Sequence, residues 1–349
     1  MATRSIYGNK LMVINYAMDP HSQVFSHQIE VVKLLATKYD SVLVVSNIVD
    51  KNIVISRVRI IESRWDEAKP LKNLLRFLIT TLPILVKYKP TVIFSHMTEV
   101  QSAALAPFSR FLKIPHFLWY AHAYPSKYLQ ISYPFLNGIV TSTKGSCPLK
   151  GRKVHPIGQG VDTRNFIPMR RVHWDIKNFI NIGRFDPAKK IEEIIETVIP
   201  QSINKTLTLE IVGSPSSKKF QDYQNTVMSK YSHSYNWIKF TKSINRQEVP
   251  HFLNRKDCFI HAFQGSLDKT LIESTLCMLP VVTINSEYIK IFGSWSEKKS
   301  ITLSQEIEHL FNLSDEAINK ELQRRFDIAY SNHSLDQWVS KLLKILGKA

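Results

Sequence analysis

Residues 258–284 read CFIHAFQGSLDKTLIESTLCMLPVVTI. An apolar run, Cys258–His261, is followed by a loop with one glycine, an amphipathic segment, Lys269–Met278, and a second apolar run, Val281–Ile284. Two such runs joined by a helical segment predict parallel strands with a crossover helix. Because parallel sheets are covered by helices on both faces, the stretch predicts an α/β fold.

The same alternation of short apolar runs and helical spacing continues through the chain. Predicted strands are 11–16, 42–45, 54–61, 92–94, 117–120, 139–142, 178–182, 207–212 and 237–240. Predicted helices between them include 27–39, 70–86, 191–197 and 220–231. Since the pattern restarts at Asn178, we expect two doubly wound, Rossmann-like units, 1–168 and 169–332, with ligands bound at the carboxyl ends of the strands.

The chain is basic, and the excess charge is uneven. Its 349 residues include 46 Lys plus Arg against 29 Asp plus Glu, a net charge of +17. Residues 1–165 carry 21 of the basic and 9 of the acidic side chains. This half predicts an anionic partner, such as a membrane surface or a phosphorylated ligand, although solubility alone also accounts for it. No nucleic-acid-binding module is recognisable, so we expect no nucleic-acid partner.

Targeting and membrane signals are few. Three scattered cysteines indicate neither a disulfide framework nor a metal site, and no apolar run approaches the roughly 18 residues of a membrane span. We therefore expect a cytoplasmic protein. Pro70–Lys89 combines a leucine stripe with Lys and Arg. It fits a helix lying peripherally on an anionic membrane and equally a helix facing the core.

The loop after the predicted strand 178–182 has the chemistry of a phosphate site. It reads GRFDPAKK from Gly183 to Lys190. Arg184 offers a planar fork for phosphate oxygens and Lys189 a point charge. The same segment also fits a solvated basic loop.

The loop after Cys258–His261 has a second set of candidates. Gly265 permits close backbone approach, and Ser266 or Asp268 can cap the helix that starts near Lys269. Free amides at a helix start favour an anion. Glu273 is placed to accept hydrogen bonds from two ribose hydroxyls. An ordinary capped helix with a solvent-facing Glu273 fits the segment too.

Taken together, these segments resemble retaining GT-B glycosyltransferases of glycosyltransferase family 4, the glycosyltransferases group 1. The first resembles that family's "GRL…KG" phosphate loop, and 263–282 resembles its donor helix, "E-G-…-E-A-M-A-C-G-x-P-V-V". The segments 89–96, 114–122, 159–166 (QGVDTRNF) and 209–213 (LEIVG) agree in order. The resemblance spans about 10–340 and is weaker in the first half.

The resemblance implies two Rossmann-like domains facing across a cleft, with 333–349 returning as a helix to the first domain. It implies transfer of a hexose-type sugar, with retention, from a UDP- or GDP-sugar to a hydroxyl of a glycan or lipid-linked acceptor. No metal and no cofactor beyond the donor would be needed. The acceptor class points to cell-surface polysaccharide or glycolipid assembly.

The resemblance also implies roles for single residues. Gly183, Arg184 and Lys189 would bind the donor diphosphate. Glu273 would bind the ribose. His122 would lie on the acceptor side near the reacting carbon. The donor sugar would contact the backbone of Gly265, Ser266, Leu267, Asp268 and Lys269.

The chain departs from the family pattern at several positions. Gly265 stands where the family's first glutamate is usual, and Asp268 is the nearest acidic residue. Lys190 and Met278 replace usual glycines, and the glycines expected after the first strand are absent. The missing glutamate keeps a noncatalytic, transferase-derived binding protein open as an alternative, beside a nucleotide-sugar epimerase on the same fold.

Candidates for acceptor contacts lie in the first half. His21 follows the first predicted strand, and His96 and Glu99 follow the strand 92–94. We expect all three at the rim of the cleft. A helix-capping role for His21 and a packed or ordinary surface position for His122 are the competing interpretations.

Overall fold

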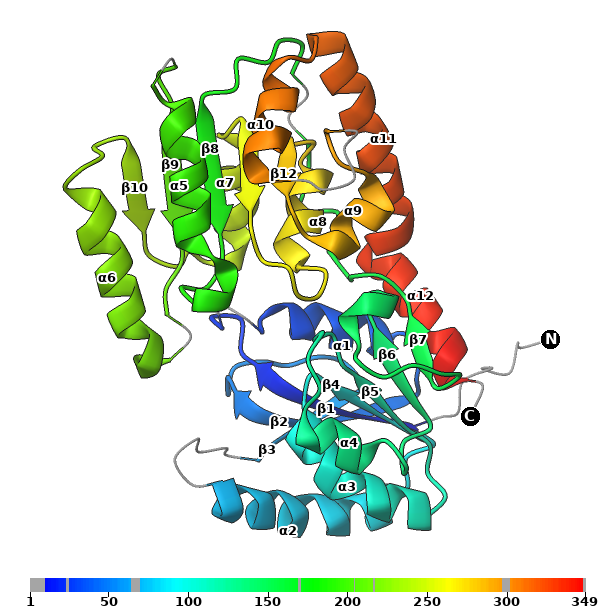
Figure 1. Ribbon diagram of the computed structural model, residues 1–349. Helices are drawn as coiled ribbons and strands as arrows, with labels where there is room; N and C mark the ends of the chain where they lie inside the picture. The colour runs from blue at the N-terminus through cyan, green and yellow to red at the C-terminus, as the bar shows by residue number, and fades with distance from the viewer. Residues whose placement is uncertain are drawn as a thin grey trace. The chain divides into compact units, whose positions relative to one another are not determined.

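The computed structural model describes residues 10–22, 25–63, 70–168, 171–203, 205–215, 217–296 and 302–347. The chain forms two compact units: the first holds the residues up to Gly160 and from Leu335 onward, and the second holds Val161–Ser334 (Figure 1). The first break precedes the expected residue 168 because Val161 already pairs with Ser334 within the second unit. The Val161 amide donates to the His333 carbonyl oxygen at 2.9 Å.

The first unit is built on a parallel sheet with strand order β3-β2-β1-β4-β5-β6-β7. The strands are β1 Lys10–Met18, β2 Ser41–Val49, β3 Val58–Glu62, β4 Val92–His96, β5 His116–Trp119, β6 Gly138–Thr141 and β7 Val154–Pro156. Val13 pairs with Val44 of β2 on one side and with Phe94 of β4 on the other. The strand order therefore reverses between β1 and β4.

Helices cover both faces of this sheet, as Figure 1 shows. They are α1 His27–Ala36, α2 Pro70–Tyr88, α3 Glu99–Phe111, α4 Lys127–Ser132 and α12 Leu335–Leu346, with the short η1 Lys144–Ser146. Leu11 and Val13 pack with α1 and α12, whereas Met12 and Ile14 pack with α2. This alternation along β1 is the period-two pattern of a strand buried on both faces.

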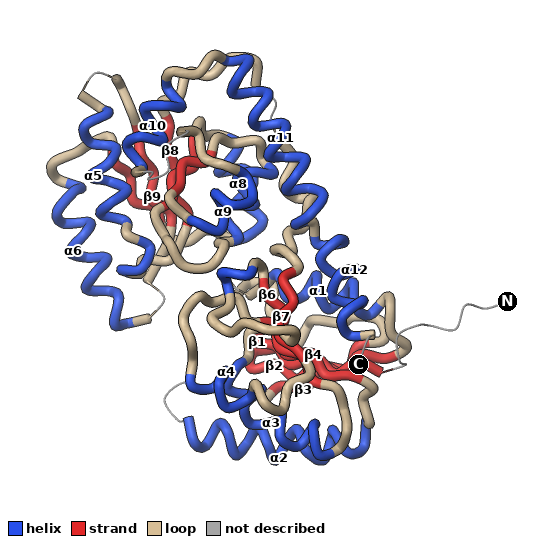
Figure 2. The backbone as a smooth tube through the Cα atoms, turned by 45° about the vertical axis from the view of Figure 1, so that its right-hand side comes forward, coloured by secondary structure: helices blue, strands red, loops and turns tan. Residues whose placement is uncertain are grey.

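The second unit has a parallel sheet of order β10-β9-β8-β11-β12. Figure 2 shows β8 and β9 of this sheet with helices around them. The strands are β8 Asn178–Ile182, β9 Thr208–Val212, β10 Ile238–Thr241, β11 Cys258–His261 and β12 Val281–Thr283. The α-helices are α5 Ile191–Gln201, α6 Gln221–Ser232, α7 Val249–Asn254, α8 Lys269–Leu276, α9 Ser286–Phe292, α10 Leu303–Phe311 and α11 Asp315–His333. The short helices are η2 Pro187–Lys189, η3 Lys218–Phe220 and η4 Arg246–Glu248. The predicted α/β class is confirmed.

Two apolar clusters cover the two faces of the second sheet. Phe179 of β8 packs with α5, α6 and α10, and its neighbour Ile180 packs with α7, α8 and α9. The strand order reverses between β8 and β11, so the loops after these two strands lie at the topological switch point of this unit.

Candidate functional site

The loop after β8 is held firmly against β9. The Gly183 amide donates to the Val212 carbonyl at 3.0 Å, and the Phe185 amide to the Ser214 carbonyl at 2.9 Å. A Cβ on Gly213 would lie 1.8 Å from the carbonyl oxygen of Gly183, so only glycine allows this approach.

Arg184 sits between these two anchors. Its side chain is exposed, and among the described residues no hydrogen-bond or ion-pair partner is found for it. A cation with a fixed backbone and a free guanidinium is suited to a ligand with phosphate oxygens.

Lys189 differs from Arg184 because it is already paired. Its ammonium forms an ion pair with the Asp268 carboxylate and lies 4.0 Å from the centroid of the Phe263 ring. His261 Nε2 lies 3.2 Å from the same carboxylate. Burial raises the pKa of Asp268, but Lys189 and His261 outweigh burial, so this pKa falls below its ordinary value. The ion pair between Lys189 and Asp268 therefore links the loop after β8 to the loop after β11.

The structure accounts for a glycine at position 265. The Phe263 ring covers Gly265, and a Cβ there would lie 2.1 Å from a ring atom. Asn285 holds the loop in this shape by donating to the carbonyl oxygens of Phe263 at 2.9 Å and Ser266 at 3.2 Å. Asp268 supplies the carboxylate of this loop. Leu267 is 1% exposed and packs in the core, so its side chain is not available to a ligand.

Glu273 is buried on α8, with its side chain 1% exposed, rather than solvent-facing. Oε1 is ion-paired with the guanidinium of Arg246 from η4. Oε2 is buried and has no hydrogen-bond partner among the described residues. Leaving a buried polar atom unpaired costs about 1–3 kcal/mol, so this oxygen is a candidate for binding a ligand hydroxyl.

Lys269, one turn before Glu273, adds a further cation. It is half-buried; burial and the Arg246 charge lower its pKa to about 7, and Glu273 opposes the shift. A bound anion would favour the charged form of Lys269.

In the first unit, the structure brings His122 and Glu99 together. They line a cavity of about 90 Å³ with Met97, Trp119, Tyr120 and Ala121, at the carboxyl ends of β4 and β5. His122 is exposed, and its ring lies 5.3 Å from that of Tyr120. The packed alternative for His122 is therefore not what the structure has.

His96 and His21 do not line this cavity. His96 is 4% exposed and stacks on Trp338 of α12 with ring centroids 5.8 Å apart, so it lies in the core and not at the rim. His21 is exposed in the turn after β1, where its backbone amide donates to Asp19 Oδ1 at 2.8 Å.

Arg246, His261, Phe263 and Asn285 are absent from the sequence-based candidates. They lie at or directly after the carboxyl ends of β10, β11 and β12. Position after a parallel strand was the signal that could have found them, because these ends share one edge of the sheet.

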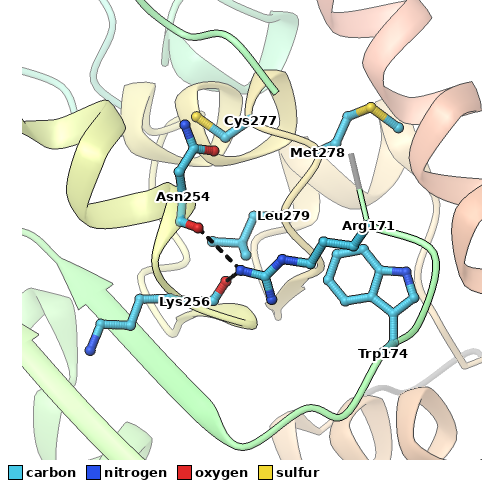
Figure 3. A pocket seen from close by; sticks show the side chains of 7 residues that line it. All are labelled: Arg171, Trp174, Asn254, Lys256, Cys277, Met278 and Leu279. Carbon is cyan, nitrogen blue, oxygen red and sulfur yellow. Dashed lines mark hydrogen bonds between the residues drawn. The ribbon is translucent and has the colours of Figure 1, made fainter. Parts of the chain in front are cut away.

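Another hollow in the second unit is structural (Figure 3). The Arg171 guanidinium fills it, donating to the carbonyl oxygens of Asn254 at 3.1 Å and Lys256 at 2.7 Å and pairing with Asp257. The centroid of the Trp174 ring lies 5.3 Å from the central carbon of this guanidinium. The remaining space is too narrow for a water molecule, so we do not regard it as a ligand site.

Comparison with known proteins agrees with this geometry. Residues 174–330 match the family model for glycosyl transferases group 1. HepE of Anabaena in complex with UDP is 14% identical with a TM-score of 0.72, over 97% of this chain and all of that one. Sucrose-phosphate synthase of Thermosynechococcus elongatus is 12% identical with a TM-score of 0.74, over 96% of this chain and 97% of that one. No curated protein sequence matches the chain.

Both solved structures cover nearly the whole chain, so the likeness extends through the first unit as well as the second. At this level of identity the likeness concerns the fold. The chain thus has the two-domain GT-B fold, and its residues 174–330 are similar to the glycosyl transferases group 1.

Proposed function

We propose that the chain transfers a sugar from a nucleotide diphosphate sugar to a hydroxyl acceptor. The observation that carries this proposal is the pair of unsatisfied groups at the switch point of the second sheet. Arg184 has an exposed guanidinium and Glu273 has a buried oxygen, Oε2, and neither group has a partner among the described residues. A diphosphate next to a ribose offers oxygens to the first and hydroxyls to the second.

The charges around this edge fit a dianion. Arg184, Lys189, Arg246 and Lys269 face only two carboxylates, those of Asp268 and Glu273, in the interactions described above. Fixed cations and the free amides at the start of α8 would stabilise negative charge that develops on the leaving diphosphate.

The proposed reaction keeps the anomeric configuration. The bond between the anomeric carbon and the diphosphate oxygen breaks while the acceptor oxygen bonds to the same face of that carbon. The acceptor proton passes to the departing phosphate oxygen, so no protein carboxylate needs to form a covalent intermediate. His122 would lie beside the reacting carbon. Arg184 and Lys189 would hold the diphosphate.

UDP-glucose is the donor to test first. Structural neighbours from Anabaena were solved with UDP, with UDP and glucose, and with UDP-glucose. The proposed acceptor is a glycan or lipid-linked glycan of the kind used in surface polysaccharide assembly.

A peripheral position on a membrane belongs to this proposal. Phe77 and Leu85 of α2 are buried in the core, yet Leu75 and Ile79 on another side of the helix are 61% and 65% exposed. The helix therefore has an outward apolar stripe beside its core-facing one, and exposed Lys72 and Lys87 lie on the same helix. In the part of the chain that is described, no helix is long and apolar enough to cross a membrane.

Calorimetric titration with UDP tests the donor site. We expect the intact protein to bind UDP and Glu273→Gln to bind it ten- to a hundredfold more weakly, because a charged acceptor of hydrogen bonds is lost. Glu193→Gln, a half-buried carboxylate on α5, is the matched control and should bind normally. Unchanged affinity in Glu273→Gln would place the donor site elsewhere.

Arg246→Ala separates ligand binding from a purely structural ion pair. If Glu273 served only to hold Arg246, both variants would lose stability and neither would change the dissociation constant for UDP. UDP binding without transfer to any acceptor would favour the noncatalytic alternative.

A further inference from the structure

Two carboxylate oxygens are buried without a hydrogen-bond partner among the described residues. One is Oε2 of Glu273, and the other is Oε2 of Glu99 in the first unit. Glu99 begins α3, directly after the carboxyl end of β4. The two orphaned oxygens thus occur at corresponding edges of the two sheets.

Glu99 is held in place by its neighbours. The side chain of Ser126, the residue that caps α4, hydrogen-bonds to the Glu99 carboxylate. This contact fixes the side chain but leaves Oε2 unsatisfied. The 90 Å³ cavity that Glu99 lines has room for several water molecules or for one edge of a sugar ring.

The other lining groups narrow the chemistry of the occupant. The Tyr120 hydroxyl donates its proton to the Tyr124 carbonyl oxygen at 2.7 Å, so it does not donate to a ligand. Trp119 and Tyr120 contribute aromatic surface, and among the lining residues that the structure describes there is no Lys or Arg. The cavity therefore offers the Glu99 acceptor, the His122 ring and apolar surface, with no Lys or Arg among the described lining residues to neutralise a phosphate or carboxylate on the ligand.

We propose that this cavity binds the acceptor through an uncharged sugar residue, one of whose hydroxyls donates a hydrogen bond to Glu99. This inference rests on the proposed glycosyl transfer and adds the class of the acceptor's terminal group. Glu99 is then a specificity-determining residue that favours neutral sugars over phosphorylated or acidic ones, because a second anion beside its carboxylate is repelled.

Because the pKa of Glu99 is raised, we expect sugar binding to depend on pH. Burial raises that pKa above its ordinary value, and the hydrogen bond from Ser126 opposes the rise. Tyr120, directly after β5, and Ser126, the N-cap of α4, lie beside the carboxylate, and His122 lines the same cavity. Burial and the Glu99 charge raise the pKa of Tyr120 to about 12. As the pH falls, Glu99 takes up a proton and loses an acceptor, so sugar binding weakens in acid.

Saturation-transfer NMR with free glycosides tests the inference without requiring turnover. The probes are the methyl glycosides of glucose, galactose and mannose, together with glucose 6-phosphate and glucuronate. We expect at least one neutral glycoside to bind the intact protein, with binding reduced at least tenfold in Glu99→Gln. Glu30→Gln, a carboxylate on α1 of the same unit, should bind as the parent does. In Glu99→Gln the weakening of binding in acid should be reduced.

A second variant guards against misfolding of the first. Ala121→Leu keeps the carboxylate but fills the cavity, and it should also abolish glycoside binding. The inference fails if no neutral glycoside binds, if glucose 6-phosphate or glucuronate binds better, or if both variants bind glycosides as the parent does.

UDP titration of the same samples separates this inference from the proposed function. Both variants should keep the parent's dissociation constant for UDP. If UDP fails to bind while glycoside binding still depends on Glu99, the donor proposal falls and the sugar site stands. If UDP binds but glycoside binding does not depend on Glu99, the sugar site is wrong and the donor proposal stands.

Discussion

The two units carry similar sheets but opposite chemistry at their strand ends. In the second unit, the segment after β8 brings Arg184 and Lys189 to the edge of the sheet, and the loop after β11 brings Asp268, the partner of Lys189. In the first unit, the cavity at the ends of β4 and β5 is lined by a carboxylate and aromatic rings. The fold thus sets where a ligand can bind, and the loop residues set its charge.

The largest expected effect comes from Arg184→Ala. We expect transfer from UDP-glucose to fall about 100- to 1,000-fold, the usual loss when one donor to a developing anion is removed. The melting temperature should stay within a degree or so, because exposed cations contribute little to stability. Turnover equal to that of the parent would remove Arg184 from the leaving-group site, and a large drop in melting temperature would show a structural role instead.

Lys189→Met should affect activity and stability together, which distinguishes it from Arg184→Ala. Arg184 and Lys189 were both expected to be exposed loop cations. The structure instead pairs Lys189 with the largely buried Asp268. Losing this partner should cost about 1–3 kcal/mol of unfolding free energy at neutral pH, together with a fall in transfer.

The stability loss in Lys189→Met should depend on pH in a defined direction. The pKa of Asp268 is lowered in the folded protein, so its stabilisation is present at neutral pH and is lost as the pH falls through the folded value. Urea unfolding should therefore show the gap between parent and variant narrowing below about pH 4. A gap that is constant down to pH 3 would contradict the role given to Asp268.

A smaller effect is expected at the exposed stripe of α2. Of the fifteen exposed large apolar side chains among the described residues, eleven lie in the first unit. Leu75→Ser with Ile79→Ser should weaken binding to phosphatidylglycerol vesicles about three- to tenfold in a sedimentation assay. Ile203→Ser, which removes an exposed isoleucine of the second unit, is the control. Binding that ignores lipid charge or salt would argue against this surface.

The smallest effect concerns two positions where the family has glycine. Lys190 and Met278 both have positive φ, 51° and 54°, a region that costs most side chains about 1 kcal/mol. Lys190→Gly should therefore raise the unfolding free energy by up to about 1 kcal/mol. Met278→Gly should lower it, since the buried Met278 side chain packs in the core. Chemical denaturation of both variants measures the difference, and the same sign in both would refute the argument.

The sequence was sufficient for the fold and for placing some of the candidate site residues at strand ends. Alternating apolar runs identified most strands because buried parallel strands leave a plain hydrophobic signal. Gly183, Arg184 and the loop Gly265–Lys269 were found because each follows such a run. Their pairing was not visible: the sequence does not show that Lys189 reaches Asp268, or that Phe263 covers Gly265.

Burial was the main quantity that the sequence could not supply. His96 was placed at the rim, but Trp338 of α12, far away in the sequence, covers it. Glu273 was expected to bind a ribose, with a solvent-facing position as the alternative, but the sequence did not show that Arg246 of η4 pairs with it in the interior. Both outcomes depend on contacts between distant segments, which local periodicity does not encode.

The position of α12 has a consequence for how the protein is made. Trp338 and Leu342 of this helix are part of the core of the first unit, although they follow the entire second unit in the sequence. A ribosome therefore releases every residue of Val161–Ser334 before the first unit can complete its core. During synthesis the second unit can finish folding before the first. Until α12 is made, the apolar face of the first unit that α12 covers stays exposed and can be bound by chaperones.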